Sequence, residues 1–254
     1  MRLLRNLILL LLVLAILAAL VLAFIPAQFA IDRFGDRLGP LKLDEVSGTL
    51  WSGQANRTLL RGENLGALRW TLSPLGLLSA RADADLDLSG GPYVGRAAVS
   101  ITRDRVVRIR NLDVTMSARK IEPLLDIPAL VFRGEVQVTL NSAEVRGGVP
   151  LALDGRAVWK NAAVAGSAEA QFGDIVSEFA SKPAGGFEGT VSDSGGPLQA
   201  QGSYSASLAG YEADIQLRAR DNNPQVLEAL QYIGKPQPDG SSRLEIRGRI
   251  LDLM

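Results

Sequence analysis

The sequence predicts a mainly β protein: an N-terminal transmembrane helix, then a largely antiparallel, glycine-bent β-sheet or open barrel with one or two short helices. An uncharged apolar run fills most of the first thirty residues. Beyond it, apolar and polar residues alternate in many short segments, and glycine-rich breaks separate these segments. The predicted division is therefore an anchor over residues 1–30 and a β-rich domain over residues 31–254.

The prediction of the anchor rests on the length of the apolar run and on the charges that flank it. Leu7–Ile25 supplies 19 residues without a polar side chain, close to the roughly 20 that span a bilayer as a helix. Arg2 and Arg5 precede it, so the positive-inside rule puts the N-terminus in the cytoplasm and the following domain outside it. A cleaved signal peptide, with Val21-Leu22-Ala23 as its cleavage site, is the alternative. Because the apolar run exceeds the 7–15 residues usual for such peptides, we favour the uncleaved anchor.

Alternation predicts the strands. In Leu78–Leu88 every second residue is Leu or Ala, and Ser, Arg or Asp stands between them. Val136, Val138 and Leu140 repeat this pattern against polar neighbours. The same period of two predicts further strands over Ala97–Thr102, Val106–Arg110, Asn111–Ser117, Leu151–Trp159, Ser203–Leu208, Glu212–Arg220 and Arg243–Ile250.

Glycines mark the breaks between these strands and the bends within them. Turns are predicted at Ser89-Gly90-Gly91-Pro92, Gly147-Gly148, Gly185-Gly186 and Ser194-Gly195-Gly196-Pro197. "FRGEV", "LDGRA" and "IRGRI" place a glycine inside strand-like sequence, which is typical of a bulge or sharp bend. Similar turn-and-strand pieces recur irregularly, which indicates a meander of hairpins.

Two helices are predicted after the anchor. Asn222 and Asn223 can cap a helix that Pro224 opens and Gly234 ends. Its apolar face consists of Val226, Leu227, Leu230 and Ile233. A shorter amphipathic helix is expected over Ile175–Phe179.

Composition excludes several functions. The chain has no Cys and no His, which removes disulfides, thiol nucleophiles, the usual general base and the usual transition-metal ligand. Its 27 basic and 27 acidic residues balance and form no basic run, so we expect no nucleic-acid partner. No cofactor is expected, since neither glycine-rich "SGG" nor "GTVSDSGG" has the spacing of a phosphate loop.

Two other sets of side chains are candidates for a metal site or for catalysis. Asp83, Asp85 and Asp87 could ligate a hard cation, but their period of two lines them about 7 Å apart on one strand face. A solvated face is the better interpretation, and no metal site is expected. A Ser–Lys pair remains open in principle, yet none of the lysines at 42, 120, 160, 182 and 235 stands in a Ser-x-x-Lys context. We therefore expect no catalytic residue and no enzyme.

Trp51 stands between two Ser-Gly pairs, in the stretch "VSGTLWSGQANRTLL". Tight backbone around so large a ring favours a structural plug at one end of the sheet. A partner-docking ring is the alternative, because aromatic residues are enriched at binding hot spots.

In combination, "GTLWSGQA" (Gly48–Ala55), "LRWTLSPLGLLSARADADL" (Leu68–Leu86) and "NPQVLEALQYIGKPQPDGSSRLEIRGRI" (Asn223–Ile250) follow a basic stub and a membrane helix. In this order they resemble the protein N family of the bacterial type II secretion system, also called general secretion pathway protein N. The resemblance covers essentially the whole chain. The positions that match its recurrent pieces are Trp51, Gly53, Trp70, Pro74, Leu227, Leu230, Gly234 and Gly240.

The resemblance implies a single-pass subunit of the inner membrane, with a cytoplasmic N-terminus and a periplasmic domain. It implies a non-catalytic role that helps link the inner-membrane platform with the outer-membrane secretin, through which folded periplasmic proteins leave. The eight matching positions are candidates for partner docking. In this scaffold hypothesis the anchor packs beside platform helices and strand edges add partner strands.

A second hypothesis belongs to another functional class. AsmA-like envelope proteins also combine an N-terminal membrane helix with repetitive strands. A groove lined by Leu, Val and Ala could hold acyl chains, so this alternative has the chain bind or transfer lipid.

Overall fold

The computed structural model describes residues 24–35, 39–125, 127–147, 149–182, 185–207 and 210–248. The predicted anchor over Leu7–Ile25 lies almost entirely outside these ranges. Within them, no helix is long and apolar enough to cross a membrane. Residue contacts group the chain into two compact units, Met1–Pro92 and Tyr93–Met254.

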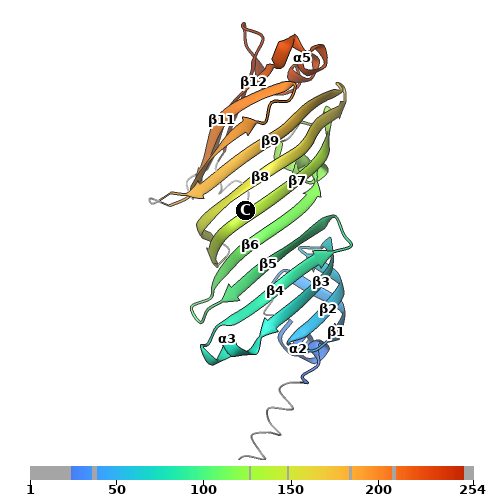
Figure 1. The fold of residues 1–254 in the computed structure, drawn as a ribbon, viewed down its shortest axis with the longest axis vertical. Coiled ribbons are helices and arrows are strands. Elements are labelled where there is room, and N and C mark those ends of the chain that lie inside the picture. Colours follow the sequence, from blue (N-terminus) through green and yellow to red (C-terminus); the bar gives the residue numbers. More distant parts are fainter. Residues whose placement is uncertain are drawn as a thin grey trace, which may run out of the picture. The chain divides into compact units, whose positions relative to one another are not determined.

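The first unit is a four-stranded antiparallel meander with two short helices (Figure 1). Its strands pair in chain order, and α2 lies against β1. Its elements are α2 (Ala27–Phe34), β1 (Leu41–Gly48), β2 (Ser52–Leu60), β3 (Glu63–Ser73), α3 (Pro74–Leu78) and β4 (Ala82–Ser89).

The strand predicted over Leu78–Leu88 begins later than expected. The chain leaves α3 at Leu78 and makes a turn in which the amides of Ser79 and Arg81 both donate to the carbonyl of Gly76, at 3.0 Å each. β4 therefore starts at Ala82, and from there the predicted alternation holds.

The second unit is a larger antiparallel sheet in the order β5-β6-β7-β8-β9-β10-β11-β12-β14-β13 (Figure 1). The predicted largely antiparallel sheet is thus confirmed. Its first part contains β5 (Tyr93–Ile101), β6 (Val106–Ser117), the 3-10 helix η2 (Ala118–Ile121), α4 (Glu122–Leu125), β7 (Leu130–Arg146), β8 (Val149–Gly166) and β9 (Ala170–Ser181). Its second part contains β10 (Phe187–Asp193), β11 (Leu198–Ser207), β12 (Gly210–Ala219), η3 (Arg220–Asn222), α5 (Pro224–Leu230), β13 (Lys235–Pro236) and β14 (Ser242–Gly248).

The helix predicted over Ile175–Phe179 is wrong. These residues form the middle of β9, where Ile175 pairs with Trp159 and Phe179 pairs with Gly155. Ile175, Ser177 and Phe179 share one face of the sheet because strand side chains alternate. The predicted strands over Val106–Arg110 and Asn111–Ser117 are one strand, β6, in which Asn111 has a positive φ of 51°.

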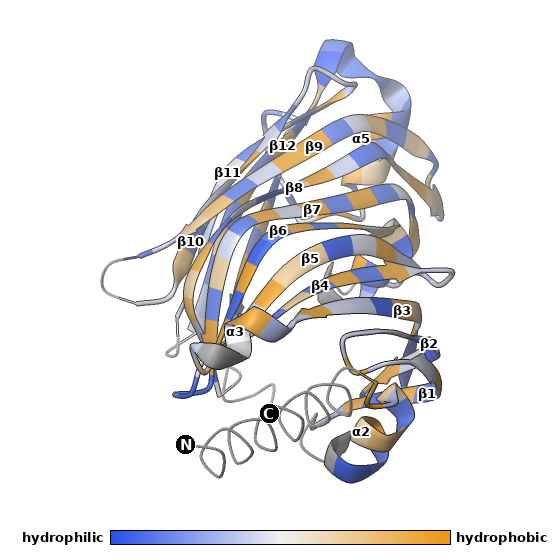
Figure 2. Cartoon of the chain, turned by 60° about the horizontal axis from the view of Figure 1, so that its bottom comes forward, coloured by the Kyte–Doolittle hydropathy of each residue, from blue (hydrophilic) through white to orange (hydrophobic). Residues whose placement is uncertain are grey.

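The core lies on one face of the second sheet, where α5 covers β9 and β12. Trp159, which is partly buried, packs against this core, with Phe132 and Phe172 at ring-centroid distances of 5.5 and 6.3 Å. Its indole Nε1 donates to the carbonyl of Arg133, 2.8 Å away, so the indole N–H has a partner. Figure 2 shows the alternation behind this burial as hydrophobic and hydrophilic bands along the strands.

The predicted cap of α5 is confirmed. The Asn223 side chain accepts from the amide of Val226 at 3.1 Å, and Pro224 opens the helix, where its missing N–H costs nothing. The helix ends at Leu230, before the Gly234 that was expected to end it, and Ile233 reaches the core from the following loop.

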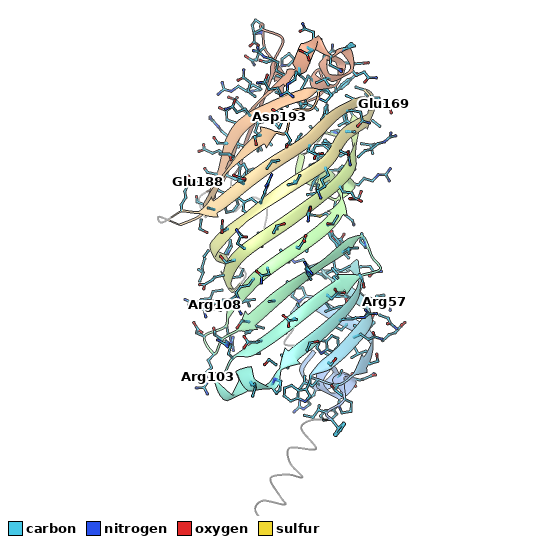
Figure 3. The ribbon with its side chains drawn as sticks, viewed as in Figure 1. Arg57, Arg103, Arg108, Glu169, Glu188 and Asp193 are labelled. Atoms are coloured by element: carbon cyan, nitrogen blue, oxygen red, sulfur yellow. The ribbon has the colours of Figure 1, made fainter. Side chains whose placement is uncertain are left out.

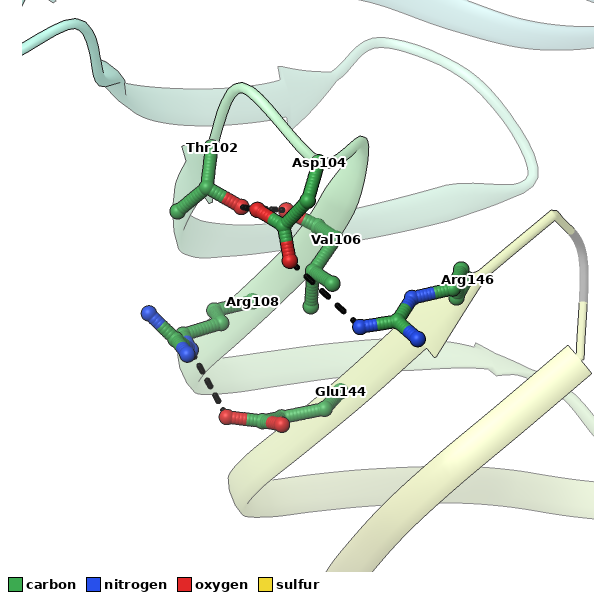
Figure 4. Close-up of polar contacts among 6 residues, drawn as sticks. All are labelled: Thr102, Asp104, Val106, Arg108, Glu144 and Arg146. Carbon is green, nitrogen blue, oxygen red and sulfur yellow. Dashed lines mark hydrogen bonds and ion pairs between the residues drawn. The ribbon is translucent and has the colours of Figure 1, made fainter.

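Charged pairs fix the β5–β6 turn and the β6–β7 register (Figure 4). Thr102 Oγ1 donates to Asp104 at 2.6 Å, and Arg146 reaches the other carboxylate oxygen at 3.4 Å. The Thr102 hydrogen bond and the nearby arginines hold the pKa of Asp104 below its usual value. Arg108 donates to Glu144, its direct cross-strand neighbour, at 2.7 Å. These pairs are exposed, so they contribute more to register than to stability.

The Ser194-Gly195-Gly196-Pro197 turn is organised by the carboxylate that precedes it. Asp193 accepts from the amides of Gly195 and Ala200, at 2.9 and 3.1 Å, and forms an ion pair with Arg220 at 2.7 Å. Burial acts to raise the pKa of Asp193, but the Arg220 hydrogen bond, the two amides and the arginine charge outweigh it and lower the pKa.

Replacing this carboxylate should destabilise the second unit in a pH-dependent way. Asp193→Asn removes a charged acceptor whose side chain is only 11% exposed, so we expect a loss of about 1–3 kcal/mol at pH 7. Because the folded pKa is lowered, the contribution is complete above about pH 4, the unfolded value, and disappears as pH falls through the folded pKa. Urea unfolding of both chains in detergent at pH 7 and pH 3 measures this. An equal difference at both pH values would contradict the assignment.

Candidate docking surfaces

The first candidate surface is the turn between β1 and β2, which contains Trp51; we call Thr49–Trp51 the Trp51 turn. Trp51 is half-buried, and its carbonyl accepts from the amide of Leu72 in β3 at 2.7 Å. On the other side of the turn, the amide of Leu50 donates to Ile25 at 2.9 Å, and Thr49 forms a β-bridge with Pro26. The turn therefore fastens the segment that follows the predicted anchor to the end of β3.

Trp70, from β3, supports this turn from within the sheet. Its Nε1 donates to the carbonyl of Leu50 at 3.1 Å. Its ring lies over Gly53, its direct partner on β2, so closely that a Cβ at that position would lie 2.4 Å from the ring. Gly53 is required because any side chain at this position would displace the Trp70 ring.

Pro74 is exposed and opens α3 directly after β3. The structure therefore gathers four of the sequence-predicted positions, Trp51, Gly53, Trp70 and Pro74, along the β2–β3 ladder and its end.

The other four positions belong to the second unit. Leu230 is buried at 4% exposure, and Leu227 packs partly buried beside the same core. Gly234 has a φ of 74°, and a Cβ there would lie 2.6 Å from the Arg243 carbonyl. Gly240, with a φ of 77°, stands in open space in the turn before β14. These residues shape the helix, loop and strand at the end of the described chain.

The second candidate surface is a polar groove of about 1080 Å³ on the face of the second sheet opposite its core. Directly opposed residues share a sheet face, so the strand registers define two polar rows across it. One row is Thr139, Arg156, Glu178, Thr190, Ser203, Asp214 and Glu245. The other is Asp154, Ala180, Glu188, Ser205, Glu212 and Arg247.

Charge in the polar groove is mixed, with carboxylates in excess. Arg243, at its margin, holds both carboxylate oxygens of Asp214, at 2.8 and 2.5 Å. The hydrogen bonds from Arg243, with the charges of Arg243 and Arg247, lower the pKa of Asp214. The hydrogen bonds to Asp214, with the charges of Asp214 and Glu245, raise the pKa of Arg243. Figure 3 shows Glu188 beside the β9–β10 turn, where it pairs with Lys182 at 3.2 Å. Such walls suit a polar partner and offer little to an acyl chain.

The third candidate surface is the edge of β14. β12 pairs with one side of it along Ser242–Gly248. On the other side, β13 pairs only with Ser242 and Arg243 among the described residues. Leu244–Gly248 therefore presents a strand edge on which Glu245 and Arg247 alternate with Leu244 and Ile246, and charges of this kind limit unselective pairing.

Asp83, Asp85 and Asp87 lie along β4 opposite Ser73, Thr71 and Arg69 of β3. Asp83 forms an ion pair with Arg81 at 2.8 Å, and the other two are exposed. Over the ranges that the structure describes, no group of three His, Cys, Asp or Glu side chains could hold a metal ion.

Sequence reasoning missed the polar groove and the β14 edge as sites. A signal for the groove was present, since Glu188 and Thr190 stand at alternate positions of one segment. Without β9 and β10 as strands, however, the rows could not be assembled.

Comparison with known proteins shows the family to which the chain belongs. The model of the family described as "Type II secretion system (T2SS), protein N" matches residues 39–245, a range that contains all eight predicted positions. The chain belongs to this family. It is 29% identical over 241 residues to the type II secretion system protein N of Vibrio cholerae serotype O1, covering 90% of this chain and 91% of that protein. No solved structure matches it. The chain therefore takes part in protein transport by type II secretion, as the resemblance implied.

The contact between Gly53 and Trp70 can be tested by a double-mutant cycle. Gly53→Ala should cost about 1–3 kcal/mol of unfolding free energy, because the new methyl group overlaps the Trp70 ring. In a Trp70→Ala background the same change should cost at least about 1 kcal/mol less, because the ring is gone. Chemical unfolding of the four chains, followed by circular dichroism, gives the coupling. Additive effects would show that the ring does not set the requirement for glycine.

Proposed function

We propose that this chain is a non-catalytic accessory subunit of the type II secretion machinery, held in the inner membrane by residues 1–30 with its β-rich domain in the periplasm. There it helps link the inner-membrane platform with the outer-membrane secretin during export of folded periplasmic proteins. The observation that carries this proposal is the protein N family match over residues 39–245. The apolar run from Leu7 to Ile25, directly before the described residues, supports the membrane anchor.

Two surfaces support a linking role. The β14 edge offers backbone donors and acceptors over Leu244–Gly248 to a partner strand, and the adjoining polar groove offers charges that fix its register. In the first unit, the Trp51 turn presents a half-buried aromatic ring next to the segment that follows the anchor. Neither surface requires a nucleotide or a metal, so energy for transport comes from other subunits.

The lipid-binding alternative is supported less well. It requires an apolar groove, and the groove of the second unit is lined chiefly by charged and hydroxyl side chains.

Photo-crosslinking in living cells tests the linking role. A photoreactive phenylalanine at Arg247, on the β14 edge, or at Trp51 should crosslink to secretin or platform subunits, because both positions belong to the proposed contact surfaces. The matched control is Val131 in β7, a strand paired on both sides, which is 37% exposed and should give no such adduct. Mass spectrometry identifies each adduct. Crosslinks to phospholipid alone at Arg247, which lines the polar groove, would favour the lipid-binding alternative, and no adduct at either position would contradict the linking role.

The anchor is tested by replacing residues 1–23 with a cleavable signal peptide. The released domain still reaches the periplasm, but its local concentration beside platform subunits falls, so secretion should decrease at native expression. The amount of a secreted substrate in the medium is measured, together with the amount of folded domain in the periplasm. Undiminished secretion with normal domain levels would show that tethering is not needed.

A further inference from the structure

Three large hydrophobic side chains are more exposed than any others in the described part of the chain. They are Leu75 at 74%, Phe24 at 70% and Phe29 at 63% exposure. All three belong to the first unit, and we call them the apolar tip. Isolated exposed hydrophobic residues are ordinary, but a group of the most exposed ones marks an interaction surface.

The Trp51 turn connects the chain segments that carry the apolar tip through backbone hydrogen bonds. Ile25, next to Phe24, accepts from Leu50 on one side of the turn. Leu72, three residues before Leu75, donates to Trp51 on the other side. In Figure 1, α2 and α3 both lie at the lower end of the first unit.

The α2 helix presents Phe29 outward because of how the helix packs. Its small residues Ala27 and Ala30, 1% and 9% exposed, form the side that the protein covers. Phe29 points away from that side, and the neighbouring Asp32 and Arg33 are also exposed. A short helix with an exposed apolar ring and neighbouring charges is suited to a membrane interface, where the ring enters the acyl boundary and the charges remain among headgroups.

We infer that the apolar tip is inserted into the interfacial layer of the phospholipid bilayer, so that the first unit rests on the membrane surface. The position of the apolar tip in the sequence indicates that a phospholipid bilayer covers it. The uncharged run from Leu7 is long enough to span a bilayer and ends at Ile25, one residue past Phe24, so a membrane that holds this run lies at the tip. The inference rests on the anchor of the proposed function.

Site-directed spin labelling can test this insertion directly. The chain has no Cys, so a single Cys introduced in the full-length protein is the only labelling site. Phe29→Cys and Leu75→Cys are labelled with a nitroxide in nanodiscs of phosphatidylethanolamine and phosphatidylglycerol. The matched control is Leu60→Cys, an exposed leucine of the same unit at the far end of β2, about 27 Å from the turn along the strand.

The readout is collision with oxygen, which enters the bilayer, relative to a water-soluble nickel complex. We expect this ratio to be several-fold higher at positions 29 and 75 than at position 60. Flotation of the same full-length chains with vesicles of that lipid composition reports the anchor separately.

Three results would overturn the inference. If the chains float but all three positions collide equally with nickel, the anchor stands and the tip is not inserted. If the chains do not float, the anchor fails and the inference fails with it. If positions 29 and 75 are shielded only in native membranes that contain the platform subunits, their occupant is a protein.

Discussion

Antiparallel pairing between successive strands is the constraint on which the other features of this chain depend. Within each unit, a strand of the meander forms its backbone hydrogen bonds with strands close to it in the sequence. Side chains alternate between the two faces along a strand, so a residue's position in that alternation decides which face of the sheet it joins. In β8 and β9 this sends Trp159 and Ile175 to the core, and Arg156 and Glu178 to the polar groove. A core on one face and a charged wall on the other therefore follow from one pattern.

Glycines within the strands are explained by the same cross-strand geometry. Gly53, Gly155, Gly189 and Gly248 lie directly opposite Trp70, Phe179, Tyr204 and Tyr211. A Cβ at these glycines would lie 2.4, 3.0, 2.4 and 2.4 Å from a ring carbon of the opposite residue, so each ring occupies the space of the missing side chain. Ring and glycine together fill one cross-strand position, a device that also covers the exposed backbone of a glycine in a sheet. Gly134 differs, because its φ of 102° at a break in the β7–β8 register makes it a true bulge.

Some parts of this fold could be predicted from the sequence and others could not. Local chemistry was sufficient for the glycine turns, for the Asn223–Pro224 start of α5 and for strands with strict alternation such as Val136–Leu140. It failed where a bulge or a glycine interrupts the pattern: Glu45, with a φ of 54°, breaks the alternation of β1, and β10 contains Gly189. It was misleading for Ile175–Phe179, because apolar residues spaced by four also fit a strand whose partners lie elsewhere in the chain. The groove and the β14 edge depend on cross-strand partners, which alternation within a single segment does not specify.

In the proposed role the chain acts through equilibrium contacts, and its architecture suits that role. The Trp51 turn joins Ile25 and Pro26, at the end of the predicted apolar run, to the end of β3 through backbone hydrogen bonds. The proposed anchor would therefore connect to the sheet without a flexible linker. The proposed confinement to the membrane would raise the local concentration of the domain beside other membrane-bound subunits. A short strand edge such as Leu244–Gly248 can then engage a partner through a few hydrogen bonds that would be too weak between freely diffusing proteins. Weak, tethered contacts also dissociate readily, as the proposed linking role requires.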